Sequence, residues 1–91
     1  MNRRQRTEKV ERRMILADNI QRFVEVSVYD DTKIAGKIGV TPSQLYRYRS
    51  GLSEIPATVL HELCNVLDVD VRRMFLTKTE WQHYFEDGKG S

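Results

Sequence analysis

The sequence DTKIAGKIGVTPSQLYRYRS, residues 31–50, decides the fold, because it contains two helix patterns separated by a short break. The first pattern predicts a helix over residues 32–38, and the second predicts a helix over residues 42–50. Gly39 ends the first helix, since glycine takes a left-handed turn conformation in which a Cβ atom would clash. Two helices joined by so short a turn meet at a steep angle, which leaves the outer face of the second helix clear of the domain.

Residues suited to capping precede both helices. Asp30 or Asp31 caps the first helix through a side-chain oxygen that accepts a backbone N–H bond. The second helix begins with Thr41 as a hydroxyl N-cap and Pro42 at the first helical position, where the missing N–H costs nothing. Gln44 completes a Thr-x-x-Gln capping box. Local chemistry therefore predicts where both helices begin.

Apolar residues at fixed offsets predict how these two helices pack. Ala35 is small, which lets the second helix cross closely over the first. Because Leu45 and Tyr48 are expected to face inward, the opposite face of the second helix carries Ser43 and Arg47. The apolar positions predicted to be buried in this stretch are Ile34, Ile38, Val40, Leu45 and Tyr48.

Helical spacing of apolar residues continues on both sides of this stretch. A first helix is predicted from about Glu8 to Val26, and a fourth helix is predicted to open at Pro56. The stripe expected on the first helix is Val10, Met14, Ala17, Ile20 or Gln21, and Val24. The stripe expected on the fourth helix is Val59, Leu60, Leu63, Cys64 and Leu67.

Two short helices are predicted to follow. Asp70 caps a fifth helix that is expected to bury Met74 and Phe75. A second capping box, from Thr77 to Glu80, predicts a last helix over residues 78–86. The predicted fold class is therefore all-α, a compact five-helix domain with a short extra C-terminal helix.

The composition suits one small intracellular domain. Of the 91 residues, 40% are hydrophobic and 31% are charged, which argues against wholesale disorder. No apolar run approaches the roughly 20 residues needed to cross a bilayer, and the single cysteine excludes an internal disulfide. An intracellular location is therefore expected. The expected division is a basic N-terminal arm or start of the first helix at residues 1–13, the main domain at residues 14–76, and a C-terminal aromatic helix and tail at residues 77–91.

Positive charge is concentrated in two segments. Residues 1–13 sum to +4, and residues 32–51 also sum to +4 because Lys33, Lys37, Arg47 and Arg49 are accompanied by no acid. The intervening and following segments sum to −3 each, so the net charge of +2 hides this contrast. An acid-free basic segment indicates a surface for a polyanion, and a solvated helix face is the alternative.

Residues 31–50 resemble the helix-turn-helix of the lambda-repressor-like, Cro-type (Xre) family of bacterial and phage regulators. The small residue at Ala35, the glycine at Gly39 and the apolar residues named above match that family's motif. Further likeness, from Ser50-Gly51 and Pro56 to Met74-Phe75, extends the resemblance over about residues 16–76. It implies the family's five-helix DNA-binding domain.

The resemblance also implies which side chains meet base edges in the major groove: Pro42, Ser43, Gln44 and Arg47. Arg47 is the strongest candidate because a guanidinium can grip guanine O6 and N7 with two hydrogen bonds; a phosphate contact is its alternative. Gln44 can bond adenine in the same way, or serve only in the capping box. Pro42 departs from the polar residue common there and offers only an apolar contact, such as one to a thymine methyl group.

Side chains around this helix are candidates for contacts to the DNA backbone, which set the register without reading sequence. Tyr46 can also pack on sugars or bases, or be a half-buried surface tyrosine. Asp31 departs from the family, since a carboxylate near the start of the first helix repels phosphate, and it is expected to serve only as a cap. The phosphate candidates are Lys33, Lys37, Thr41, Tyr46, Arg49 and Ser50.

Two features lie outside the motif. The segment with Arg3, Arg4 and Arg6 is a candidate minor-groove arm, with a disordered tail or a solvated extension of the first helix as alternatives. Trp81, Tyr84 and Phe85 share one face of the last helix, and so much apolar area is unfavourable in water. They are expected to pair two subunits, and folding back on the domain is the alternative.

The charge pattern indicates a DNA-binding surface. The family resemblance implies a sequence-specific transcription regulator of double-stranded DNA, a repressor of bacterial or phage origin. It is expected to act in the bacterial cytoplasm or nucleoid as a homodimer on a palindromic operator. The alternative functions are an antitoxin whose C-terminal aromatic face binds a toxin, and a protein-interaction module that uses the same fold as a scaffold. No set of residues typical of an active site, metal site or cofactor site is visible, so no enzyme activity, metal, cofactor, small-molecule ligand or membrane partner is expected.

Overall fold

The computed structural model describes the backbone of residues 3–83 and the side chains of residues 9–83. Over these residues the chain forms helices and no strand, which confirms the all-α prediction. None of these helices is long and apolar enough to span a lipid bilayer. The elements are α1 (Arg3–Val26), α2 (Asp31–Ile38), α3 (Pro42–Arg49), α4 (Ala57–Leu67), the 3-10 helix η1 (Val71–Phe75) and a helical stretch over residues 78–83.

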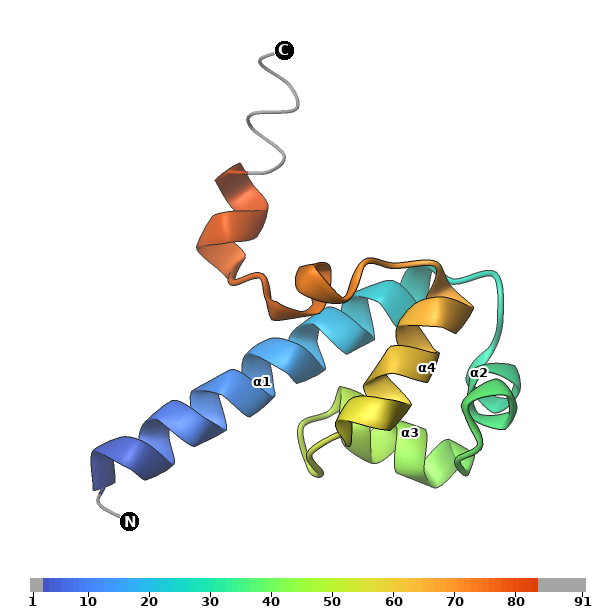
Figure 1. Ribbon diagram of the computed structural model, residues 1–91, viewed down its shortest axis with the longest axis horizontal. Coiled ribbons are helices and arrows are strands. Elements are labelled where there is room, and N and C mark those ends of the chain that lie inside the picture. The colour runs from blue at the N-terminus through green and yellow to red at the C-terminus, as the bar shows by residue number, and fades with distance from the viewer. Residues whose placement is uncertain (1–2, 84–91) are drawn as a thin grey trace.

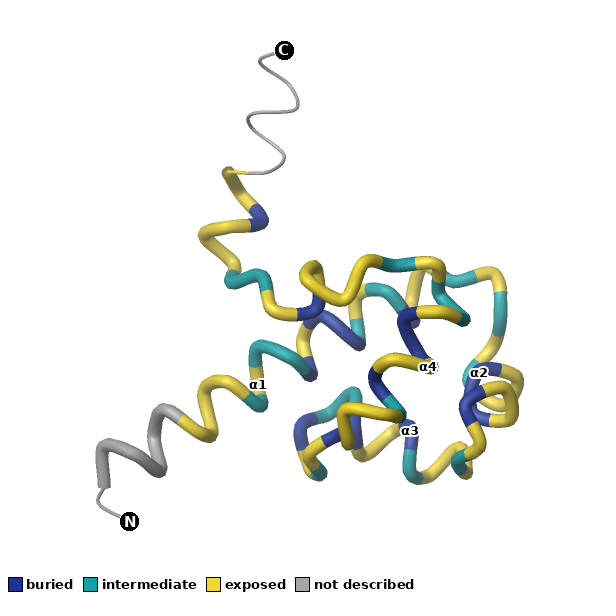
Figure 2. Tube along the Cα trace, viewed as in Figure 1, coloured by how far each residue is buried: buried dark blue, intermediate teal, exposed yellow. Residues whose placement is uncertain are grey.

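The long helix α1 extends past the other helices at its N-terminal end (Figure 1). It packs against α3 and η1, while α2 packs against α3 and α4. Its N-terminal half projects beyond the rest of the domain (Figure 2). Val10 and Met14 are exposed, so the prediction that they belong to the buried stripe was wrong: Val10 lies on the projecting part, and Met14 meets only the turn at Gly51. Ala17, Ile20 and Val24 are buried as predicted.

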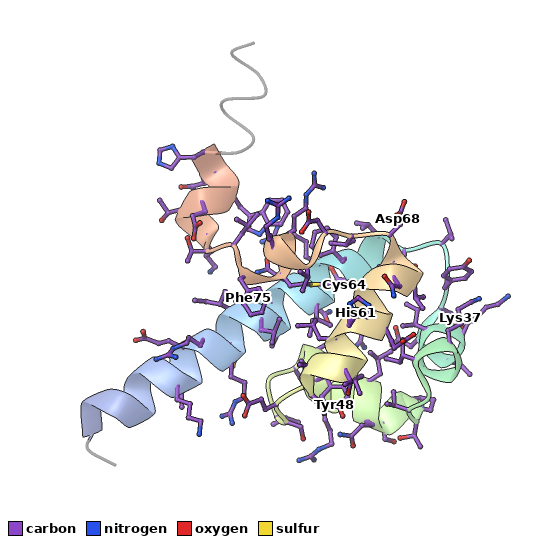
Figure 3. The ribbon with its side chains drawn as sticks, in the orientation of Figure 1. Lys37, Tyr48, His61, Cys64, Asp68 and Phe75 are labelled. Carbon is purple, nitrogen blue, oxygen red and sulfur yellow. The ribbon has the colours of Figure 1, made fainter. Side chains whose placement is uncertain are left out.

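The core is a single cluster drawn from α1 to α4 and η1, and it is centred on five side chains that are shielded from solvent. Tyr48 of α3 and Cys64 of α4 join it (Figure 3), and burial raises the pKa of the Cys64 thiol. Val59 and Leu67 lie at its edge, so the stripe predicted on α4 is confirmed with its centre buried and its margins half-buried. The five central side chains are Ile20, Ile34, Leu45, Leu63 and Met74.

The turn between α2 and α3 has the predicted backbone. Gly39 lies in the left-handed region, with φ of 76°, and its N–H reaches the last carbonyls of α2 at Ala35 and Gly36. Asp30, rather than Asp31, is the N-cap of α2, and its carboxylate accepts from the Lys33 N–H at 2.8 Å. The break between the two helices is therefore set by one glycine and one acidic cap.

Two glycines of this segment are expected to respond oppositely to alanine. At Gly39 and at Gly36 an added Cβ would meet nothing within 4 Å, so only the backbone conformation differs. Gly39→Ala should lower the free energy of unfolding by about 1–2 kcal/mol, the cost of a left-handed conformation. Gly36→Ala, inside the helix, should raise it by about 0.5–1 kcal/mol. Urea denaturation measures both, and changes of equal sign would contradict the conformational argument.

The segment after α4 differs from the predicted helix. Asp70 is the N-cap, as predicted, and its pKa is lowered to about 2 by hydrogen bonds from the Arg72 side chain and backbone. The helix that it caps is a 3-10 helix, in which successive side chains diverge by about 120°. Met74 points into the core, while Phe75 is 55% exposed, so the prediction that Phe75 is buried was wrong.

Trp81 packs on its own chain. Its ring lies 5.8 Å from the Phe23 ring, and its Nε1 donates to Asn19 Oδ1 at 2.7 Å. The predicted capping box holds the start of this last helix, with the Thr77 and Glu80 side chains each accepting the other's backbone N–H at 3.2 Å. The fold-back alternative therefore describes Trp81, while Tyr84, Phe85 and the rest of the helix predicted to residue 86 lie outside the described residues.

Candidate nucleic-acid interface

Helix α3 is held by one face and offers the other to solvent. Leu45 and Tyr48 are buried in the core, as predicted. The Thr41 hydroxyl accepts the Gln44 N–H at 3.1 Å, which places the start of α3 where the sequence predicts it. The residues predicted to read bases are exposed, except for Gln44, which is half-buried. The exposed residues are Pro42, Ser43 and Arg47.

A shallow, mostly apolar groove lies on this outer face. Pro42, Ser43, Tyr46 and Arg47 of α3 line it together with Leu52 from the following loop. Leu52 was not among the residues singled out from the sequence, because it lies beyond the helix. The sequence feature that could have indicated Leu52 is the glycine directly before it, because Gly51, with φ of 78°, turns the chain back toward α3.

The loop after α3 fixes Arg47. The carbonyl oxygen of Arg47 accepts the N–H groups of Leu52 and Ser53, at 2.9 and 3.1 Å. The side chain is held as well, because its Nε donates to Ser53 Oγ at 2.9 Å. The terminal nitrogens of the guanidinium are the edge that can grip a guanine. Ser53 thus positions the residue predicted to read bases, a role that only the folded loop reveals.

Two of the predicted phosphate contacts lie on the outer side of α2. Lys33 and Lys37 are exposed, and their ammonium groups lie 5.8 and 4.9 Å from the centre of the Tyr29 ring. Figure 3 shows Lys37 on the side of α2 that faces away from the core. The shared aromatic ring gathers the two charges into one small area, an arrangement suited to a phosphate backbone.

Arg49 is less available than its charge suggests. Its guanidinium forms an ion pair with Asp31 at 3.1 Å and lies 5.7 Å from the Tyr46 ring, and its side chain is only 21% exposed. The expectation that Asp31 serves only as a cap was wrong, since Asp30 caps α2 and Asp31 binds Arg49. This carboxylate therefore offsets one of the four positive charges in residues 32–51.

Asp31→Asn is expected to tighten binding to DNA several-fold at low salt. The change removes the charge that holds Arg49 and repels phosphate, so one more cation is free to contact the backbone. The slope of log affinity against log salt should steepen by about 0.9, the value for one added phosphate contact. Fluorescence anisotropy over a salt series measures both quantities.

Asp18→Asn is the matched control, because it changes the net charge equally while Asp18 lies in a crevice beside Trp81. If the two variants tighten binding to the same extent, the ion pair with Arg49 does not limit binding and only net charge matters.

The two predicted hydroxyl contacts differ. The Thr41 oxygen accepts the Gln44 N–H, so its own hydrogen remains available to a phosphate. The Ser50 hydroxyl donates to the Tyr46 carbonyl at 2.5 Å, so its hydrogen is already used inside the helix end. Thr41 is therefore the better placed of the two to donate to DNA.

The backbone of the predicted N-terminal arm is helical. Arg3, Arg4 and Arg6 lie in α1, which begins at Arg3 rather than near Glu8 because residues 3–13 contain neither proline nor glycine. Their side chains lie outside the described part of the chain. Among residues 9–83, no three His, Cys, Asp or Glu side chains gather where they could hold a metal ion.

Comparison with known families agrees with this geometry. Residues 30–73, from the N-cap of α2 into η1, match the family described as Helix-turn-helix. Residues 30–73 therefore form a helix-turn-helix domain of the lambda-repressor-like (Xre) type, which confirms the resemblance drawn from residues 31–50. Helix-turn-helix domains bind DNA through the second of their two helices, and α3 is that helix here. No curated protein and no solved structure matches the chain.

Proposed function

We propose that this protein is a sequence-specific transcription regulator that binds a palindromic operator in double-stranded DNA as a homodimer and represses transcription there. In each subunit, α3 enters the major groove. Arg47, Ser43, Gln44 and Pro42 face the base edges, while cations on α2 meet the backbone. The regulator is of bacterial or phage origin and acts in the bacterial cytoplasm or nucleoid.

One observation carries this proposal. The outer faces of α2 and α3 are exposed and basic, and Arg47 is held there by Ser53 with its guanidinium edge open. Asp31 offsets the charge of Arg49, but Lys33, Lys37 and Arg47 remain exposed, and a helix used only as scaffold has no reason to fix an exposed arginine beside two lysines. The surface combines charge for phosphates with a fixed donor pair for a base, which are the two parts of sequence-specific recognition.

Selection of bound duplexes from random-sequence DNA tests this function. We expect one enriched inverted repeat, whose half-sites lie about 34 Å apart so that two copies of α3 enter successive major grooves on one face. Affinity for that site should fall steeply with salt, since phosphate contacts release counterions. Enrichment of no sequence, or salt-independent binding, would contradict the proposal.

The state of the purified protein separates the regulator from the antitoxin alternative. A stable homodimer by analytical ultracentrifugation supports the regulator. A monomer that binds the selected half-site, with no gain in affinity from the second half-site, contradicts the dimer.

A further inference from the structure

We infer that the groove beside Arg47 receives the C5-methyl group of a thymine, in a base pair adjoining the guanine that Arg47 contacts. This inference deepens the proposed function and rests on it, because it names a feature of the DNA that α3 selects. The guanidinium and the groove would then read two neighbouring base pairs as one unit.

The groove has apolar walls in an otherwise basic surface. Tyr46 is 53% exposed and Leu52 is 57% exposed, and both line the groove with Pro42. Cations on the same two helices complement a phosphate backbone, but apolar side chains contribute nothing to that attraction. If the apolar side chains of the groove contact DNA favourably, the group that they contact must also be apolar.

The major groove of DNA offers one such group on its base edges, the C5-methyl of thymine. Deoxyribose and phosphate lie along the backbone, where Lys33 and Lys37 are placed, whereas the groove is on the outer face of α3. Because the groove is shallow and open, it suits a projecting methyl group better than a small molecule that must be enclosed.

Arg47 connects the groove to base reading. It lines the groove, and its Nε is engaged by Ser53, so the terminal nitrogens are directed by a fixed bond rather than by a free side chain. Because Arg47 itself lines the groove, a guanine held by its terminal nitrogens and a methyl group held by the groove would belong to nearby base pairs. We therefore assign the methyl group to the base pair next to the guanine, about 3.4 Å away along the helix axis.

Replacing single thymines by uracil tests the inference, because this change removes the methyl group and alters no hydrogen-bonding group. In the duplex selected from random DNA, each thymine is replaced in turn, and the affinity of the full chain is measured by anisotropy. At one thymine position per half-site, next to a guanine, the affinity should fall about four-fold, the factor that burial of one methyl group contributes. Uracil elsewhere should leave the affinity unchanged.

Variants connect that loss to the groove. Leu52→Ala is expected to bind the thymine and uracil duplexes equally, because the wall that covers the methyl group is gone. Val71→Ala, a truncation of another exposed aliphatic side chain, on η1, should keep the four-fold difference. Circular dichroism confirms that both variants retain their helices.

A second arm separates the methyl group from the rest of thymine. At the same position, 5-methylcytosine should bind about four-fold more tightly than cytosine, since the pair differs by the same group. Equal affinity for these two duplexes would overturn the inference.

The inference also fails if the selected site has no fixed thymine beside a guanine, or if Leu52→Ala keeps the full response to uracil. If a specific site is found but uracil does not lower the affinity for it, the inference about the methyl group is wrong and the proposed function still stands. Absence of any specific site removes both.

Discussion

Asn19→Ala is expected to lower the free energy of unfolding by about 2–4 kcal/mol, a large loss for one polar side chain. Asn19 is 1% exposed, and each part of its amide has a partner. Nδ2 donates to the carbonyls of Met74 and Leu76, at 2.8 and 2.9 Å, and Oδ1 accepts the Trp81 Nε1–H at 2.7 Å. Alanine leaves two carbonyls and one indole N–H without these bonds in a shielded site.

Trp81 reports this loss directly, because it is the chain's single tryptophan. In Asn19→Ala the indole should become more hydrated, and its fluorescence maximum should move to longer wavelength before global unfolding begins. Asn65→Ala, an exposed substitution on α4, is the matched control and should change stability by less than about 0.5 kcal/mol. An Asn19 variant as stable as this control would show that the last helix is not held through Asn19.

Arg47→Ala is expected to weaken binding to the selected operator by about 1–3 kcal/mol, with a much smaller loss on random DNA. The reason is that a bidentate contact to guanine discriminates between sequences, whereas a phosphate contact does not. Anisotropy with the operator and with a shuffled duplex, at one salt concentration, gives the ratio of affinities. That ratio should collapse in Arg47→Ala.

Two variants sharpen the interpretation of Arg47. Arg47→Lys keeps the positive charge but loses the planar fork and the Nε bond to Ser53, so it should bind random DNA normally and lose discrimination. Lys37→Ala, in a proposed phosphate contact, should weaken both duplexes alike. If Arg47→Ala also weakens both duplexes alike, Arg47 contacts phosphate, which is the alternative that its sequence position left open.

Much of the fold follows from local chemistry that the sequence displays. Thr41 and Pro42 begin α3, Asp30 caps α2, and Gly39 takes the left-handed turn, because each of these effects needs only the residue and its nearest backbone. The inward positions of Leu45 and Tyr48 follow from helical periodicity. The family resemblance rests on Gly39, Leu45 and Tyr48 together with Ala35 and the other apolar positions of α2 and the turn, which is why the amino-acid sequence alone was enough to reveal it.

The surroundings of the site were decided by the tertiary structure. Leu52 and Ser53 reach α3 because the loop turns back, and Asp31 pairs with Arg49 because α2 packs against α3. Met74 of η1 is buried and the adjacent Phe75 is exposed, since only one side of that short helix faces the core. The sequence separations between these contacting residues do not match the repeat of a helix or a strand, so no sequence pattern predicts the contacts.

Periodicity therefore determined which face of each helix is apolar, and capping determined where helices begin. Whether an apolar face is covered depended on what lies opposite it, as Val10 and Trp81 illustrate. Val10 continues the stripe of α1 yet is exposed where that helix extends beyond its neighbours, whereas Trp81 is covered because Asn19 and Phe23 meet it. The physical reason is that hydrophobic burial is a property of two surfaces, and the sequence of a helix specifies only one of them.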